Sequence, residues 1–241
     1  MDGIKICGLT KKYKDIIAVD NLSLSVYKGE LFSLLGVNGA GKTTTIKMLS
    51  CLTQPTSGDA FLNGKSIIGD AADVKSIIAV SPQETAVAMG LTVYENLELI
   101  CGAYGFSKQK RNIKIKEIGE LLGLDTVLNK KAAKLSGGWQ RRLSIAMALI
   151  SEPQILFLDE PTLGLDVLAR RELWKQIEKL KGKITIILTT HYLEEAESLS
   201  DRIGIMAKGE LKAVGTADEL KKLPKTDNFE EAFVRIVKGV K

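Results

Sequence analysis

One nine-residue stretch constrains the fold of this chain more than any other feature. It runs from Gly36 to Thr44, reads Gly-Val-Asn-Gly-Ala-Gly-Lys-Thr-Thr, and fits the pattern G-x-x-x-x-G-K-[ST] without a mismatch. The apolar run 31–35 precedes it, and residues 44–49 after it carry apolar side chains at helical spacing. A strand, a glycine-rich loop and a helix are the context in which this pattern binds nucleotides. We therefore predict a phosphate-binding loop here.

The residue types of this loop suit a polyphosphate. We expect its three glycines to adopt positive φ, which side chains resist, so that backbone N–H groups can turn inward around an anion. The positive end of the following helix adds to this attraction. Lys42 would reach the β- and γ-phosphates, and the Thr43 hydroxyl would bind Mg²⁺. The residues predicted to hold the nucleotide here are Gly36, Asn38, Gly39, Ala40, Gly41, Lys42, Thr43 and Thr44.

Length and composition are those of an ordinary soluble protein. The 241 residues suffice for one large domain or for one domain with a subdomain. The apolar share is 45% and the charged share 26%, and no apolar run approaches the roughly 18 residues that span a bilayer. The start of the chain lacks the pattern of a secretory signal, and three widely spaced cysteines predict neither a disulfide framework nor a zinc site. We expect a cytosolic protein whose net charge of +5 permits an anionic partner without requiring one.

Hydrophobic periodicity predicts an α/β fold. Alternating residues at 4–7 and 22–26 indicate an antiparallel β layer at the start of the chain. Continuous apolar runs are typical of buried parallel strands. Such runs occur at 31–35, 77–80, 155–159 and 184–188. A mostly parallel sheet behind the phosphate-binding loop follows from this pattern.

The period changes to helical between residues 92 and 149. We therefore predict one domain with an inserted helical subdomain at about 91–150, while 1–90 and 151–241 form the P-loop core and the β subdomain. Near the end of the chain, residues 203–214 read as a β-hairpin and two short helices follow.

Two acids follow the apolar run 155–159. Asp159 would lie at the carboxyl end of a strand beside the P-loop, where it can hold Mg²⁺ directly or through water. Glu160 comes next, points in a different direction, and can accept a proton from an attacking water. Alternatively, the pair is only the polar end of a strand, although the P-loop in the same chain favours function.

A second glycine-bearing loop, Leu135-Ser136-Gly137-Gly138, precedes a predicted helix. A helix N-terminus with exposed N–H groups is again a site for an anion. One chain with one P-loop needs a single such site for its own phosphates, so the second suggests a nucleotide held by another copy. The alternative is an ordinary helix capped by Ser136.

Two further residues could contact a nucleotide. His191, the only histidine, follows the run 184–188 at a carboxyl end, where α/β sheets bind ligands. Tyr13 lies between the first two predicted strands and could stack on a base, although packing is the simpler role for an aromatic there.

Together these residues resemble the ATP-binding cassette ATPases, the nucleotide-binding subunits of ABC transporters. The resemblance covers nearly the whole chain, with six motifs in the family's order and approximate spacing. Residues 36–44 are similar to Walker A, 155–159 to Walker B, and 135–138 to the signature motif. The resemblance implies ATP and Mg²⁺ as cofactors. It makes Glu160 the catalytic glutamate, His191 the switch histidine and Gln83 the Q-loop residue near Mg²⁺ and the attacking water. It also implies an adenine-stacking role for Tyr13, a D-loop at Gly164–Asp166, metal contacts from Thr43, Gln83 and Asp159, and nucleotide contacts from Ser136, Gly137 and Gly138.

The signature motif departs from the family's pattern at its fifth position. Trp139 stands where the family most often has glutamine, and Gln140 follows one residue later. Ser136 and both glycines are intact, so we expect activity to be preserved. Three segments are similar to the ATPase subunits of ABC-2-type exporters, namely residues 162–166, residues 190–197 and the short tail. We expect no appended regulatory domain.

The resemblance implies an ATPase subunit that dimerises head-to-tail, with each ATP–Mg²⁺ held between the P-loop of one copy and Ser136 of the other. The second copy is expected to be the same chain or a paralogue. Because no spanning segment is found, we expect a separate membrane permease as partner, a position on the cytoplasmic face of the membrane, and no specific nucleic acid. The alternatives are a soluble cassette ATPase acting on ribosomes or DNA, an importer ATPase, an unrelated P-loop enzyme, and a nucleotide-gated binding module.

The loop after Gln83 carries the expected contact with the permease. Residues 86–89, Ala-Val-Ala-Met, are apolar for an exposed loop, which suits a protein interface. The resemblance implies a groove beside this loop for a helix of the permease. We therefore expect Val87 to lie on the surface, and the alternative is that the segment folds back into a small local core.

Overall fold

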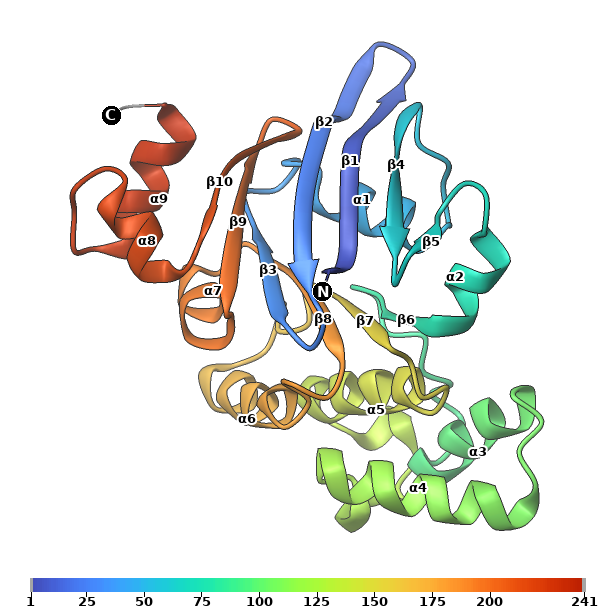
Figure 1. The fold of residues 1–241 in the computed structure, drawn as a ribbon. Coiled ribbons are helices and arrows are strands. Elements are labelled where there is room, and N and C mark those ends of the chain that lie inside the picture. The colour runs from blue at the N-terminus through green and yellow to red at the C-terminus, as the bar shows by residue number, and fades with distance from the viewer. Residues whose placement is uncertain (1, 240–241) are drawn as a thin grey trace.

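A six-stranded sheet forms the centre of the molecule, for which a computed structural model describes residues 2–239 (Figure 1). Its strands are β3 (Leu31–Leu35), β6 (Ile78–Ser81), β7 (Ile155–Asp159), β8 (Thr185–Thr190), β9 (Arg202–Ala207) and β10 (Glu210–Gly215). They lie in the order β10-β9-β3-β8-β7-β6, and every neighbouring pair is parallel except the hairpin β9–β10. The mostly parallel core and the C-terminal hairpin are therefore confirmed.

A smaller antiparallel sheet covers one side of this core. It consists of β1 (Asp2–Tyr13), β2 (Ile16–Tyr27), β4 (Ser57–Leu62) and β5 (Lys65–Ser66), in the order β2-β1-β4-β5. The first two strands are much longer than the alternation in the sequence predicts. Register shifts interrupt their pairing, and each shift moves side chains to the other face, which hides the period of two.

The central strands are continuously apolar because they face two cores. Leu156 and Leu158 of β7 pack on the side of the helical segment, whereas Ile155 and Phe157 pack on the side of the small sheet. Burying such side chains on both faces stabilises the fold by about 1.5–3 kcal/mol for each of them. The sheet thus becomes the rigid layer from which the loops at its carboxyl edge project.

Helices cover both faces and one end of the central sheet (Figure 1). They are α1 (Lys42–Leu49), α2 (Ala71–Ile77), α3 (Val93–Ala103), α4 (Lys108–Leu122), α5 (Gly137–Leu149), α6 (Val167–Glu178), α7 (Leu193–Leu199), α8 (Ala217–Lys222) and α9 (Phe229–Lys238). The predicted capping box at Thr92 begins α3, and Gly123 in the left-handed conformation ends α4. Helix α2 is absent from the sequence predictions because only two of its seven residues are buried, too few for a periodic pattern.

Helices α3, α4 and α5 pack against one another at one end of the molecule, beside α6 (Figure 1). Their shared core includes Leu97, Ile115 and Leu143 and continues into β7 and β8. The division of the chain at residues 90 and 150 stays a prediction, but the helical content of this segment is as expected.

The expectation that Val87 is exposed is wrong. Its side chain is 8% exposed and belongs to the core formed by α3, α4 and α5. The buried amide of Asn96 explains this position, because it accepts from the Ala88 backbone N–H at 2.9 Å and donates to the Ala88 carbonyl at 3.1 Å, which folds the loop inward. Met89, two residues later, does stay on the surface, with 41% exposed.

We predict that Val87→Asp destabilises the protein rather than altering a surface contact. An unpaired carboxylate in this core should lower the free energy of unfolding by about 3–5 kcal/mol, since it replaces apolar contact with an unsolvated charge. Urea denaturation measures this directly. Met89→Asp in the same loop is the matched control and should change the free energy of unfolding by no more than about 0.5 kcal/mol. Equal stability of the two variants would contradict the buried position of Val87.

Candidate nucleotide site

The loop between β3 and α1 owes its shape to glycines that serve different purposes. Gly39 and Gly41 adopt positive φ, at 80° and 103°, as expected. Gly36 does not, so the prediction of positive φ is wrong for this residue. Glycine is needed there for space, because a Cβ atom would lie 2.4 Å from the carbonyl oxygen of Met206 in β9. The loop is thereby pressed onto the end of the sheet.

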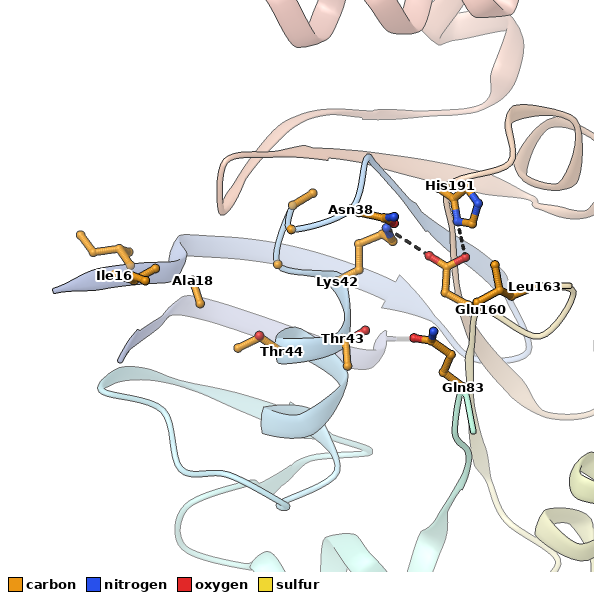
Figure 2. A pocket seen from close by; sticks show the side chains of 14 residues that line it. Ile16, Ala18, Asn38, Lys42, Thr43, Thr44, Gln83, Glu160, Leu163 and His191 are labelled. Atoms are coloured by element: carbon orange, nitrogen blue, oxygen red, sulfur yellow. Dashed lines mark hydrogen bonds and ion pairs between the residues drawn. The ribbon is translucent and has the colours of Figure 1, made fainter. Parts of the chain in front are cut away.

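An open cleft of about 510 Å³ lies over this loop (Figure 2). Most of the residues predicted to bind the nucleotide or to act on it line it together. The lining residues are Ile16, Ile17, Ala18, Asn38, Gly39, Ala40, Gly41, Lys42, Thr43, Thr44, Gln83, Glu160, Leu163 and His191. Segments from β2 to β8 therefore converge on one cavity.

The Glu160 carboxylate lies between two cationic or hydrogen-bonding groups (Figure 2). Its Oε1 is 3.2 Å from Nζ of Lys42, and its Oε2 is 2.7 Å from Nδ1 of His191. Glu160 is only 6% exposed and Lys42 5%, so this ion pair is held away from bulk water. Lys42 also donates to the carbonyl of Gly36 at 2.7 Å, which fixes the amine above the loop.

The backbone of Glu160 adopts a conformation that is rare for its residue type. Its φ is +48°, in the left-handed region that favours glycine. The backbone N–H donates at 3.1 Å to the carbonyl and at 3.1 Å to the hydroxyl of Thr189 in the neighbouring strand. Strain of this kind persists where the surroundings hold it and occurs often at functional sites. Here it turns the carboxylate out of the line of β7 and into the cleft.

Asp159 and Thr43 bring two oxygen atoms together at the start of α1. The Thr43 hydroxyl donates to Oδ1 of Asp159 at 3.1 Å, and the Thr189 hydroxyl donates to the same oxygen. Mg²⁺ bound with a polyphosphate commonly takes one or two protein oxygens and completes its shell with phosphate and water. A hydroxyl and a carboxylate beside a phosphate-binding loop fit this ion. Within residues 2–239 there is no cluster of three or more His, Cys, Asp or Glu that could hold a metal without such a ligand.

Gln83 projects into the cleft from the segment that follows β6 (Figure 2). Tyr13, predicted to stack on a base, lies outside the described lining, at the end of β1 and 44% exposed. It is paired in the β-ladder with Ile16, which does line the cleft. Sequence reasoning missed Ile16 and Ile17, because two apolar residues at the start of a strand carry no signal of ligand contact.

The signature loop does not line this cleft. In the described part of the chain Ser136 holds the N-cap position of α5, but its hydroxyl makes no capping hydrogen bond. The serine is exposed and borders a separate hollow together with Trp139, Asp166 and Leu168. Gly138 is buried for packing, since an added Cβ would lie 3.1 Å from Cβ of Ala169 in α6. The alternative that Ser136 simply caps α5 through its side chain is therefore not supported by the geometry.

The unusual Trp139 packs on the helical core and remains partly accessible. The guanidinium of Arg142 lies over its ring at 4.4 Å, a cation–π contact. Gln140 donates from its amide to the carbonyls of Ala132 and Leu135 at 3.1 and 3.2 Å. The displaced glutamine therefore braces the loop that precedes Ser136.

Behind the cleft lies a buried acid that the sequence did not single out. Glu195 of α7 is fully buried, and the indole Nε1 of Trp174 donates to its Oε1 at 3.0 Å. Burial raises the pKa of Glu195, while the hydrogen bond from Trp174 acts in the opposite direction. The carboxyl group therefore favours its protonated form more than an exposed glutamate does.

Comparison with protein families gives one match that spans most of the chain. The family model described as "ABC transporter" matches residues 19–163. The phospholipid-transporting ATPase ABCA3 of Homo sapiens is 43% identical over 223 residues, covering 91% of this chain and 13% of the relative. The probable multidrug ABC transporter ATP-binding protein YbhF of Escherichia coli K12 is 40% identical over 235 residues, covering 95% of this chain and 40% of the relative. The chain thus spans less than half the length of these two relatives.

Solved structures share the whole fold. The ATP-binding subunit of an ABC transporter superposes with a TM-score of 0.84 at 30% identity, covering 97% of this chain and 98% of that one. The dimeric post-hydrolysis state of the ATP-binding cassette MJ0796, bound to ADP and Pi, gives a TM-score of 0.78 at 29% identity, covering 88% of this chain and 98% of that one.

We predict that Glu195→Gln stabilises the protein increasingly as the pH rises. Above the ordinary glutamate pKa of 4.5 the unfolded wild type loses a proton that buried Glu195 retains, so wild-type folding is disfavoured and the neutral glutamine escapes this cost. The difference should grow by up to about 1.4 kcal/mol per pH unit until the raised pKa is reached and then stay constant. Urea denaturation of both proteins between pH 5 and 8 measures it. Exposed Glu194→Gln is the matched control, and a difference independent of pH would refute the protonated state.

Proposed function

The chain belongs to the ABC transporter family of ATPases, and from this premise we propose that it hydrolyses ATP between two copies to drive a separate membrane permease. The position of Glu160 between Lys42 and His191, in the cleft over the P-loop, supports this proposal most directly. A carboxylate that faces a phosphate-binding loop and is oriented by a histidine has the position a general base requires.

The proposed chemistry uses this chain's side chains in distinct roles. The loop N–H groups and the Lys42 ammonium bind the β- and γ-phosphates and stabilise the charge that develops on them. Glu160 accepts a proton from the attacking water. The water oxygen bonds to the γ-phosphorus, and the bond between the γ-phosphorus and the β-phosphate oxygen breaks. His191 holds the Glu160 carboxylate by its 2.7 Å contact.

Mg²⁺ fits the oxygens of Thr43 and Asp159, with Gln83 beside them, and when bound it would neutralise phosphate charge. Two hydroxyls, from Thr43 and from Thr189, donate to the same oxygen of Asp159 and keep it in place. The two apolar residues Ile16 and Ile17 would contact the base or ribose at the open end of the cleft.

The signature loop supports the proposal of a second copy. Ser136 has a free hydroxyl at a helix N-terminus, yet it lies away from the chain's own cleft. Beside it, Val167 and Leu168 are 61% and 80% exposed, which is unusual for apolar side chains next to a polar site. A head-to-tail pair would cover these residues and bring Ser136 to the γ-phosphate bound by the partner, in keeping with the dimeric MJ0796 structure.

A groove between the core and the helical segment supports the proposed permease contact. It has a volume of about 320 Å³ and runs along β6 and the segment after it. Its lining is largely apolar and comprises Ile78, Ala79, Val80, Pro82, Ala86, Ile100, Tyr104, Ser144, Met147, Ala148 and Ser151. An amphipathic helix of the permease would suit such a groove, and one of its lining residues, Pro82, directly precedes Gln83. This surface replaces Val87 as the proposed contact.

Export is the proposed direction of transport, with the chain at the cytoplasmic face of the membrane beside its permease. The names of the relatives ABCA3 and YbhF, a phospholipid-transporting ATPase and a probable multidrug transporter protein, support an exporter. Among the described residues no helix is both long and apolar enough to cross a membrane. In the densest run of cations, 108–116, every cation except Lys108 has an acidic partner among the described residues, for example Arg111 with Glu98 at 2.9 Å, so the run offers little to a nucleic acid.

We predict that Glu160→Gln keeps ATP binding but lowers turnover by about 10²–10⁴-fold, the usual contribution of a general base. The trapped ATP should hold two copies together, so this variant should elute as a dimer with ATP and as a monomer without it. Phosphate release and size-exclusion chromatography measure the two effects. Lys42→Ala should instead weaken ATP binding itself.

Ser136→Arg, added to Glu160→Gln, tests the partner's contribution. The added bulk and charge should abolish the ATP-dependent dimer while each copy still binds ATP in its own cleft. Wild-type activity that is full and independent of protein concentration in a monomer would rule out the shared site, and wild-type turnover of Glu160→Gln would rule out the assigned base.

We predict that Tyr104→Asp, in the groove, weakens attachment to the membrane partner but leaves ATPase activity of the isolated chain within about twofold of wild type. Tyr104 is 56% exposed, so the change should not disturb the fold. Leu99→Asp, on the helix that Tyr104 caps, is a matched control, because Leu99 is also 56% exposed but lies outside the groove lining. Binding to salt-washed membranes of the native cells compares the variants; equal binding of all three proteins would place the contact elsewhere.

A further inference from the structure

Arg141 makes a contact that the sequence did not predict. It lies on α5, five residues after Ser136, and its side chain is 5% exposed. Its Nη1 donates to the carbonyl of Pro82 at 2.7 Å, and its Nη2 donates to the carbonyl of Gln83 at 2.6 Å. The guanidinium thus holds two successive backbone carbonyls at the point where the chain leaves β6 and enters the cleft.

A buried cation at this place requires compensation. Burial lowers the pKa of Arg141, and the nearby carboxylate of Asp159 acts in the opposite direction. The planar fork of a guanidinium matches two carbonyls at fixed spacing, which the point charge of a lysine does not. The adjacent Arg142 is also buried, at 9% exposed, but it lies over the Trp139 ring instead. An arginine that is buried on this helix therefore does not necessarily contact residues 82 and 83, so the contact is specific to Arg141.

We propose that Arg141 is the positioning residue for Gln83 and ties it to the signature helix. The proposal rests on the function proposed above, in which Gln83 acts beside Mg²⁺ and the attacking water. The amide of Gln83 can reach that point only if its backbone is held, and its carbonyl is held by Arg141. Because Arg141 and Ser136 lie on one helix, a shift of the signature loop toward a partner's nucleotide also moves Gln83 in the chain's own cleft.

The test compares Arg141→Lys, which keeps the charge but loses the fork, with wild type. We expect turnover to fall about tenfold and the Mg²⁺ concentration for half-maximal activity to rise several-fold, because a displacement of about 1 Å at a reacting group has effects of this size. ATP binding in the absence of Mg²⁺ should stay within about twofold. Arg111→Lys, a change of the same kind at the pair with Glu98, should leave all three quantities unchanged.

A double-mutant cycle separates positioning from general destabilisation. In a Gln83→Ala background, Arg141→Lys should cost less than twofold in turnover, since the residue it positions is gone. A full tenfold loss in that background would overturn the proposal. If Arg141→Lys does not fold, Arg141→Gln, which removes the buried charge and keeps a single donor nitrogen, is judged by the same criterion. Wild-type turnover and Mg²⁺ dependence of Gln83→Ala alone would instead refute the proposed function of Gln83.

Discussion

The candidate site depends on the parallel pairing of three strands. Leu35 at the end of β3 is in register with Thr190 of β8, and Thr189 of β8 is in register with Asp159 of β7. Parallel strands end at the same edge of a sheet, so loops that are more than a hundred residues apart in the chain begin side by side there. Apolar side chains pack on both faces of these strands, so a slip by one residue would draw their polar ends into the apolar cores.

Several charged side chains lie buried at this edge of the sheet, where each would be unfavourable without a partner. Lys42, Asp159 and Glu160 are each 5–6% exposed, and each has a partner of opposite charge or a hydroxyl within hydrogen-bond reach. Charged groups held out of water interact more strongly than exposed ones, and they bind a charged ligand without having to reorganise first. The positive φ of Glu160 belongs to the same arrangement, since the two hydrogen bonds to Thr189 hold that backbone in place.

The sequence predicted the parts of this structure that rest on local pattern. The P-loop, the apolar strands, the capping box at Thr92 and the mixed α/β architecture followed from spacing and periodicity. Contacts between distant segments did not. Burial of Val87 depends on the amide of Asn96. Position 36 requires glycine because of the nearby carbonyl of Met206. The position of the Arg141 side chain depends on two carbonyls some sixty residues away in the sequence. None of these partners leaves a local signal, because a hydrogen bond to a backbone carbonyl places no demand on the residue type that supplies it.

The two tryptophans of this chain occupy opposite environments. Trp174 is buried in the core, where its indole N–H donates to Glu195, whereas Trp139 is partly accessible beside Ser136 and lies under the Arg142 guanidinium. Indole emission moves to shorter wavelength when water is removed from the ring. Light emitted by Trp139 therefore reports on whatever covers the signature loop, while that of Trp174 changes only when the core opens. Replacing Trp174 by phenylalanine would leave a chain whose own fluorescence reads the closure of a dimer without any attached dye.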